Sequence, residues 1–253
     1  MTSLPKPAGR LLVFTLGARS EAERHPLVPR RFRTAEVEFR EACLESVIEA
    51  GNEAGLRVEV SSPRPMALGG VAAWRGQEGP TFGERLRSAV NAAFERAPEQ
   101  PLVVVGSDCP GLRAAQLIEA VRALEADPRR VVLGPSRDGG FYLLAAARPL
   151  DDVLASVAWC GRATLRTLTL ALAGAGRTVV MLGTLDDLDE PHDLVRWLAL
   201  RTPCRPRLLQ STLTLGRLLA WLCRPPLIGR CLPPPRRLPA RRLGRAPPLP
   251  AAP

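Results

Sequence analysis

Short runs of consecutive apolar residues recur along the first 200 residues, and longer stretches separate them. Runs this short and rich in β-branched residues are typical of buried strands of a parallel sheet. The predicted strands are, in chain order, 11–14, 58–60, 71–74 (an edge strand), 102–105, 131–133, 141–145 and 179–182.

The stretches between these strands carry apolar residues at helical spacing. The predicted helices run from 34 to 51 or 55, from 81 through 94, over about 113–126, near 162–174, and from 191 onward. Residues 18–33 are polar, Arg-rich and interrupted by Pro, so we expect a long loop there. Alternating strands and helices predict an α/β fold, a three-layer sandwich whose mostly parallel central sheet is covered on both faces.

Charge is unevenly distributed along the chain. The eleven arginines from Arg201 onward have no acidic counterpart, whereas residues 1–200 carry 24 basic and 25 acidic side chains and a net charge of −1. The folded part therefore has no electrostatic support for specific nucleic-acid binding. We predict one α/β domain over residues 1–202, followed over 203–253 by a helix and a basic Pro/Arg-rich tail that is partly disordered.

The segment 208–223 has a helical apolar pattern that includes Arg217. It is interpreted either as a helix docked on the domain or as an amphipathic helix on an anionic membrane or other acidic surface. A solvated tail without a partner is the third interpretation. No apolar run reaches 18 residues, Met1–Arg10 lacks the apolar region of a secretory signal, and the six cysteines match neither zinc nor disulfide spacing. We therefore expect a cytoplasmic protein with free thiols.

Acidic residues follow three of the predicted strands. Asp108 comes after 102–105, Asp138 after 131–133, and the Asp187-Leu188-Asp189 group after 179–182. Taken singly, each residue has a simpler interpretation. Asp108 would cap the next helix or stabilise the turn, and Asp138-Gly139 is a common turn dipeptide. Because ligands bind at the carboxyl ends of strands in open α/β sheets, the three loops together predict a metal–phosphate site.

Four motifs stand in the order of a known family signature. They are Ser107-Asp108-Cys109-Pro110, the stretch 134–143 with Asp138-Gly139-Gly140, Trp159, and Asp187-Leu188-Asp189-Glu190-Pro191-His192-Asp193-Leu194. Together with Phe82-Gly83-Glu84-Arg85-Leu86, they resemble a bacterial GT-A-like glycosyltransferase family long described as a domain of unknown function. The resemblance covers about residues 10–200. It implies the fold of the nucleotide-diphospho-sugar transferase superfamily.

The resemblance also implies an activity and a set of site residues. The activity is metal-dependent transfer of a glycosyl group from a nucleotide-diphosphate sugar to a small acceptor. Asp108 and Asp189 would hold Mg²⁺ or Mn²⁺, and Asp138 would be catalytic, facing the sugar or acceptor. The expected substrate-binding residues are Thr15, Gly17, Arg19, Arg85, Ser107, Gly139 and Gly140. For Arg85 a surface ion pair is the alternative.

The loop after the first strand departs from the family pattern. A basic, lysine-containing stretch is replaced by Gly17-Ala18-Arg19-Ser20, with further arginines up to Arg33. Arginine also grips phosphate, in bidentate fashion. Two alternatives stay open: a nucleotidyltransferase that releases pyrophosphate, against which the missing lysine counts, and a catalytically degenerate binding module. Cys109 has no histidine placed to activate it, so a small buried turn residue is favoured over a nucleophile.

Overall fold

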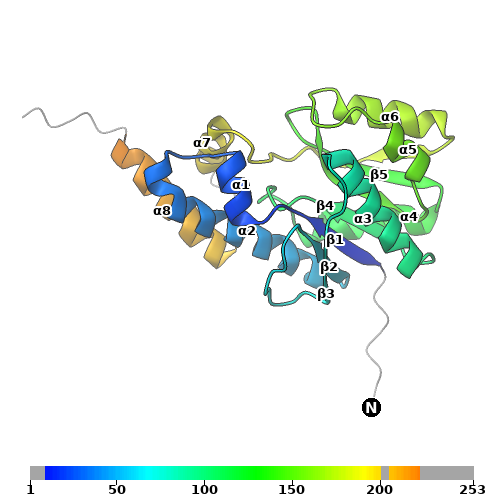
Figure 1. Ribbon diagram of the computed structural model, residues 1–253, viewed down its shortest axis with the longest axis horizontal. Helices are drawn as coiled ribbons and strands as arrows, with labels where there is room; N and C mark the ends of the chain where they lie inside the picture. Colours follow the sequence, from blue (N-terminus) through cyan, green and yellow to red (C-terminus); the bar gives the residue numbers. More distant parts are fainter. Residues whose placement is uncertain (1–8, 201–204, 223–253) are drawn as a thin grey trace, which may run out of the picture.

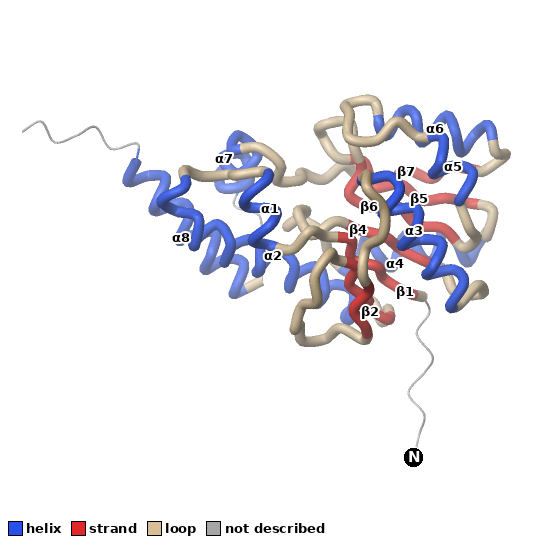
Figure 2. The backbone as a smooth tube through the Cα atoms, viewed as in Figure 1, coloured by secondary structure: helices blue, strands red, loops and turns tan. Residues whose placement is uncertain are grey.

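The computed structural model describes residues 9–200 and 205–222. Its strands are β1 (Arg10–Phe14), β2 (Arg57–Ser61), β3 (Ala73–Arg75), β4 (Leu102–Val105), β5 (Arg130–Pro135), β6 (Phe141–Ala146) and β7 (Thr178–Met181). They form one seven-stranded sheet in the order β3-β2-β1-β4-β6-β5-β7. All neighbours are parallel except the two pairs that include β6. The mostly parallel α/β sheet predicted from the sequence is confirmed. Figure 2 shows its strands in red and the helices in blue.

Helices cover both faces of this sheet, as the predicted three-layer sandwich requires (Figure 1). They are α1 (Ala18–Arg24), α2 (Arg33–Glu53), α3 (Phe82–Arg96), α4 (Ala114–Ala126), α5 (Asp151–Ser156), α6 (Thr164–Gly174), α7 (Pro191–Leu200) and α8 (Pro206–Leu222). Side chains alternate along each strand, so Leu11 and Val13 face α2 and α4 while Leu12 faces α3. Burial of these two apolar layers is the main stabilising contribution to the fold.

The reversed strand β6 has a simple cause. Only residues 136–140 separate β5 from β6, and a parallel crossover needs a dozen or more residues, so the chain turns back as a hairpin. The first residue of β6 therefore lies at the same edge of the sheet as the last residues of β1, β4 and β5. This arrangement brings the loop that contains Asp138 to the carboxyl ends of the parallel strands.

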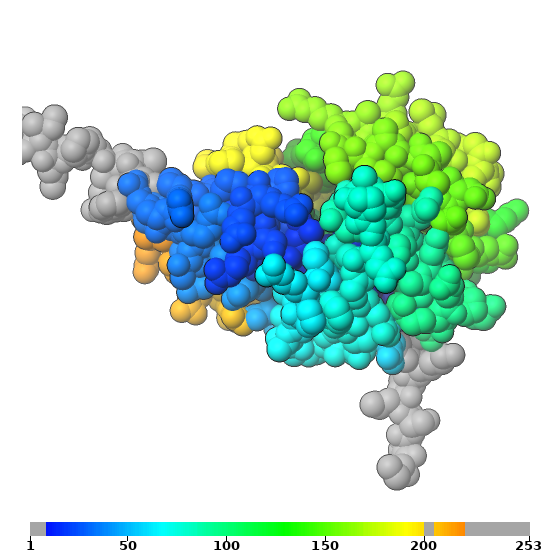
Figure 3. All heavy atoms as spheres, viewed as in Figure 1, coloured from blue at the N-terminus to red at the C-terminus, as the bar shows by residue number. Residues whose placement is uncertain are grey.

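The first half of α2 extends beyond the sheet and belongs to a third apolar cluster. There Phe39 and Cys43 are buried with Trp197 of α7 and with Leu208 and Leu215 of α8. Figure 3 shows these helices and the α/β part in contact across one continuous surface. The segment predicted to be helical near 208–223 is thus a helix docked on α2.

Ion pairs add to this docking. Arg205 pairs with Glu49 and Glu53, and Arg207 pairs with Glu45. The division of the chain at residue 202 stays a prediction, and the Pro/Arg-rich tail lies outside the described residues. Within the described ranges, no helix is long and apolar enough to cross a bilayer.

Two short helices were not predicted from the sequence. Residues 18–33, predicted to be a loop, contain α1 and a 3₁₀ turn at Arg30–Phe32. Only Ala18 and Ala22 of α1 are buried, so it has no apolar periodicity to detect. The six residues of α5 are similarly fewer than periodicity needs.

The sequence predicted that this helix ends at Gly51 or Gly55, and α2 continues past Gly51. A Cβ there would lie 2.5 Å from Leu11 Cδ2 and 2.8 Å from Val58 Cγ2, so this glycine allows α2 to approach the sheet closely. Gly55, with φ of 70°, takes the left-handed conformation just after the helix.

We predict that Gly51→Ala lowers the free energy of unfolding by about 1–3 kcal/mol, because overpacking against Leu11 and Val58 outweighs the gain of about 1 kcal/mol in helix propensity. Gly174→Ala, at the end of α6, is the matched control, since a Cβ there meets nothing within 4 Å. Urea unfolding at equilibrium measures both. Equal or greater stability of Gly51→Ala than of wild type would contradict the close approach.

Candidate functional site

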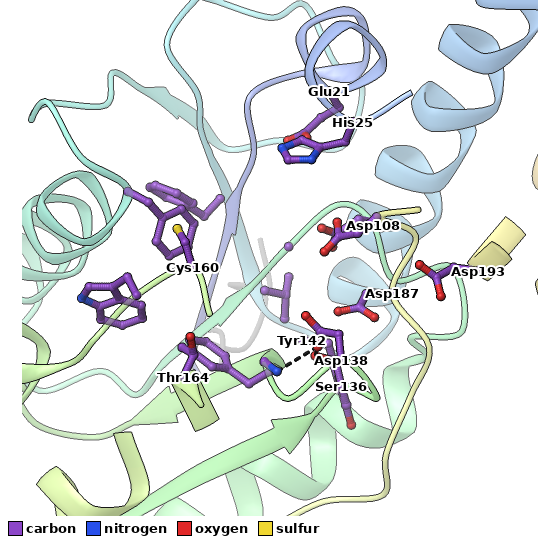
Figure 4. A pocket seen from close by; sticks show the side chains of 18 of the residues that line it. Glu21, His25, Asp108, Ser136, Asp138, Tyr142, Cys160, Thr164, Asp187 and Asp193 are labelled. Atoms are coloured by element: carbon purple, nitrogen blue, oxygen red, sulfur yellow. Dashed lines mark hydrogen bonds between the residues drawn. The ribbon is translucent and has the colours of Figure 1, made fainter. Parts of the chain in front are cut away.

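A cleft of about 650 Å³ opens at the carboxyl edge of the sheet (Figure 4). Its walls come from the ends of β1 and β4, the β5–β6 hairpin, α1, α3, the loop before α6 and the loop before α7. Segments distant in the sequence meet there because every parallel strand ends at this edge. The cleft lies where open α/β sheets bind their ligands.

Three carboxylates from two loops converge in this cleft. Oxygens of Asp138, Asp187 and Asp189 lie within 4.8 Å of one another. The loops run side by side, and Leu185 N donates a hydrogen bond to Pro135 O at 3.2 Å. Leu188 is buried, so in this extended stretch the two flanking aspartates both face the cleft.

Asp138 is held in place by its own turn. Ser136 Oγ donates to its Oδ1 at 2.5 Å, and the Gly140 amide donates to the same oxygen at 2.8 Å. These bonds orient the carboxylate toward the other two before any ligand arrives.

Asp108 stands beside the three carboxylates but outside their 4.8 Å group. Its carboxylate folds over Gly106, where a Cβ would lie 2.4 Å from Oδ1. Its carbonyl accepts a hydrogen bond from Leu188 N at 3.0 Å, which ties the β4 loop to the loop before α7. Next to it, Cys109 is buried, and burial raises the pKa of its thiol well above the usual value, as suits a turn residue rather than a nucleophile.

The aspartates in and around the cleft divide into two sets. Asp186 pairs with Arg137 at 2.8 Å and with Arg196 at 3.3 Å, and Asp193 pairs with Arg196 at 3.2 Å. Within residues 9–200 and 205–222, no ion pair is made by the members of the second set, which are Asp108, Asp138, Asp187 and Asp189. The second set therefore concentrates negative charge that no ion pair within the described residues neutralises.

Burial, reinforced by neighbouring carboxylates, disfavours the charged form of three members of this second set. It raises the pKa of Asp108, Asp187 and Asp189 to about 7. After burial, the largest contributions are the charges of Glu21 on Asp108, of Asp138 on Asp187 and of Asp108 on Asp189. Clustered carboxylate oxygens are the donors that Mg²⁺ and Mn²⁺ prefer, so the side chains present fit such an ion.

The opposite wall of the cleft is aromatic. Phe82 lies 5.6 Å from Phe14 and 5.7 Å from Trp159, and Phe141 lies 6.2 Å from Trp159, between ring centroids. Arg85 and Arg162 line the cleft as well. The cleft thus has an acidic part and a part that combines aromatic rings with guanidinium groups.

The structure brings most of the expected site residues together. Those that line the cleft are Thr15, Arg85, Asp108, Asp138, Gly140 and Asp189. Ser107 instead bonds Thr15, with 2.7 Å between the two hydroxyl oxygens, and the Gly17 amide donates to Thr15 Oγ1 at 3.0 Å. Arg19 is exposed on α1 and is not among the lining residues.

Gly139 makes a close approach to protein backbone. A Cβ on it would lie 2.1 Å from the Arg162 carbonyl oxygen. The sequence interpretation assigned no role to Arg162 and did not include Asp187 among the metal ligands. The Asp-Leu-Asp pattern at 187–189 could have indicated that Asp187 faces the same side as Asp189. Nothing in the sequence marked Arg162 as a residue of the cleft.

The crowding of negative charge leads to a stability prediction. The native-state pKa of Asp187 is raised above its usual value, so its carboxyl favours folding at low pH, and this contribution is lost as pH rises toward 7. Without divalent cations, Asp187→Asn should raise Tm by roughly 2–4 °C at pH 8, the change that about 1 kcal/mol produces, and by less at pH 5.

Asp193→Asn is the control for this measurement. It removes a carboxylate that is paired with Arg196 and accepts from Glu190 N at 2.9 Å, so it should lower Tm at both pH values. Differential scanning calorimetry with a chelator present measures both variants. A Tm of Asp187→Asn below that of wild type at pH 8 would show that the cluster carries no net repulsion.

Comparison with known proteins agrees with this architecture. The family model described as "Uncharacterized protein conserved in bacteria (DUF2064)" matches residues 43–161. The 3-phospho-D-glycerate guanylyltransferase of Phenylobacterium zucineum (strain HLK1) is 32% identical over 175 residues, which are 65% of this chain and 76% of that protein.

Solved structures share the fold. A crystal structure from Desulfovibrio desulfuricans G20, assigned as a nucleotide-diphospho-sugar transferase, has a TM-score of 0.69 at 17% identity and covers 83% of this chain and 95% of that one. CMP:2-keto-3-deoxy-manno-octonic acid synthetase in complex with CTP has a TM-score of 0.50 at 14% identity, covering 76% and 97%. The chain therefore belongs to the bacterial family DUF2064, and the family resemblance seen in its motifs is confirmed.

Proposed function

We propose that this protein is a divalent-cation-dependent transferase that binds a nucleotide-diphosphate sugar and moves its glycosyl group to a small acceptor. One observation carries the proposal: three carboxylates within 4.8 Å of one another, without an ion-pair partner in the described ranges, at the ligand-binding edge of this fold. Such a group is electrostatically unfavourable by itself, and a divalent cation with a diphosphate would neutralise it.

The side chains of the cleft would have different roles in this reaction. Asp138, Asp187 and Asp189 would hold Mg²⁺ or Mn²⁺, with Asp108 beside them. When bound, the cation supplies electrostatic stabilisation of the diphosphate leaving group, a contribution of several kcal/mol. Ser136 and the Gly140 amide keep Asp138 oriented. The aromatic wall excludes water and offers flat surfaces to a ring of the substrate.

The loop after β1 favours a diphosphate donor over a triphosphate. The Leu16 amide donates to Glu21 Oε1 at 3.1 Å and the Gly17 amide to Thr15 Oγ1 at 3.0 Å, so both amides are already bonded within the protein. No arginine of this loop is among the residues that line the cleft. Phosphates would therefore be held mainly through the cation and the aspartates.

Nucleotidyl transfer with release of pyrophosphate is the second candidate. It is favoured by the relative at 32% identity, which is a guanylyltransferase. Both candidates require a nucleotide and a divalent cation in the same cleft. They differ in the product released, which is a nucleoside diphosphate after glycosyl transfer and pyrophosphate after nucleotidyl transfer.

Thermal shift with Mn²⁺ or Mg²⁺ and a panel of nucleotide sugars and nucleoside triphosphates tests the proposal. A compound present at 100 times its Kd stabilises the protein by about 2.7 kcal/mol, so we expect a Tm rise of roughly 5 °C or more that needs the cation. Asp187→Asn and Asp189→Asn should lose this rise, since each removes a ligand of the cation.

Asp152→Asn, an exposed acidic residue of α5, is the matched control and should keep the full rise. Assays for released nucleoside diphosphate and pyrophosphate then separate the two candidates. If no nucleotide compound raises Tm in a cation-dependent way, or if Asp187→Asn and Asp189→Asn respond like wild type, the proposal is wrong and a binding module without catalysis is favoured.

A further inference from the structure

We propose that Arg85 and Arg162 form an anion-binding subsite in the cleft, and that the acceptor accordingly carries a phosphate or carboxylate group. This inference rests on the proposed function, because it assigns the second substrate of the same site. Its basis is the pairing of charged groups in the cleft and the way in which two elements fix the loop before α6.

Four arginines line the cleft, and they differ in their partners. Arg137 and Arg196 are neutralised by Asp186 and Asp193. Neither Arg85 nor Arg162 forms an ion pair within the part of the chain that the structure describes, although aspartates without ion pairs line the same cleft.

One hydrogen-bond donor of the Arg85 guanidinium group lacks an acceptor within the described residues. Its Nε is buried and has no hydrogen-bond acceptor. A buried donor without an acceptor is energetically unfavourable, and a ligand in the cleft could supply the acceptor. An oxyanion would satisfy it, because guanidinium donors match the geometry of phosphate and carboxylate oxygens.

Two glycines fix the loop 157–163, which contains Arg162, against its neighbours. A Cβ on Gly83 in the first turn of α3 would lie 2.2 Å from Trp159 Cδ1, so this indole packs directly on the turn that contains Arg85. A Cβ on Gly139 would lie 2.1 Å from the Arg162 carbonyl oxygen. Leu165 N also donates to Gly139 O at 3.0 Å. One loop therefore links the Arg85 turn to the hairpin that contains Asp138.

Arg85 and Arg162 line the same cleft as the aspartates, so the cleft contains both positive and negative side chains. The aspartates suit the cation and the donor diphosphate, and they would repel an acceptor that is itself an anion. Such an acceptor needs positive charge on the other side of the reacting group, where the aromatic wall also strengthens ionic contacts by excluding water. Arg85 and Arg162 meet this requirement, whereas an uncharged acceptor would leave both guanidinium groups without a counter-ion.

Calorimetric titration tests the subsite with four probes in the presence of Mg²⁺: inorganic phosphate, glycerate, 3-phosphoglycerate and glycerol. The variant is the double substitution Arg85→Gln with Arg162→Gln. The matched control is Arg87→Gln with Arg166→Gln, which removes two arginines of α3 and α6 that do not line the cleft. The same titrations with the nucleotide compound that stabilises the wild type serve as a second readout.

We expect wild type to bind phosphate or 3-phosphoglycerate and not glycerol. Removing two charge-assisted contacts should weaken this binding at least about tenfold in the double variant and leave the control unchanged. Nucleotide affinity should stay within about threefold of wild type, since a factor of that size is under 1 kcal/mol. Tighter binding of phosphate than of glycerate identifies a phosphate as the anion, and the reverse identifies a carboxylate.

Three results would overturn the inference. One is the absence of binding of every anionic probe to wild type, and another is equal binding by the double variant. The third is loss of nucleotide affinity alongside anion affinity, which would assign both arginines to the donor. In that third case the proposed function stands. A wild type that binds no nucleotide in the presence of a cation fails the proposed function itself, whatever the anionic probes do.

Discussion

Mutual repulsion among carboxylates at one edge of the sheet is the constraint on which the site depends. Asp108, Asp187 and Asp189 each have a pKa raised by burial and by neighbouring negative charge. Arginines neutralise the nearby Asp186 and Asp193, so the lack of such partners for the other aspartates among the described residues is selective. A site arranged in this way gives up stability by itself, and the proposed cation would restore that stability on binding.

The arrangement depends on close approaches to the backbone as well as on hydrogen bonds. Gly106 leaves room for the Asp108 carboxylate, and Gly139 leaves room for the Arg162 carbonyl. The hairpin between β5 and β6 is equally important, because its short connection turns β6 back and places Asp138 at the same edge as Asp187 and Asp189. Precise placement of the charged groups thus follows from backbone geometry in loops that the sheet holds rigidly.

Charge in the cleft is arranged in two regions, and this arrangement has consequences for chemistry. Transfer of a glycosyl or nucleotidyl group brings together a donor phosphate and an acceptor nucleophile. When both substrates are anions, their repulsion has to be screened at two separate points. A carboxylate cluster that takes a cation and a pair of guanidinium groups that take an oxyanion would do this within one cleft of about 650 Å³.

The sequence by itself determined the strands, the longer helices, the parallel character of the sheet and the three acidic loops, because apolar periodicity and turn residues are local signals. It did not reveal α1, whose burial rests on Ala18 and Ala22 alone, or the grouping of Asp187 with Asp138 and Asp189 apart from Asp108. Only the tertiary structure decided which carboxylates meet, which arginines of the cleft form no ion pair within the described residues, and that Gly139 contacts Arg162. These features arise where loops that are far apart in the sequence come together. Packing of the whole chain sets the separation of such loops in space, and a local pattern of residues carries no information about it.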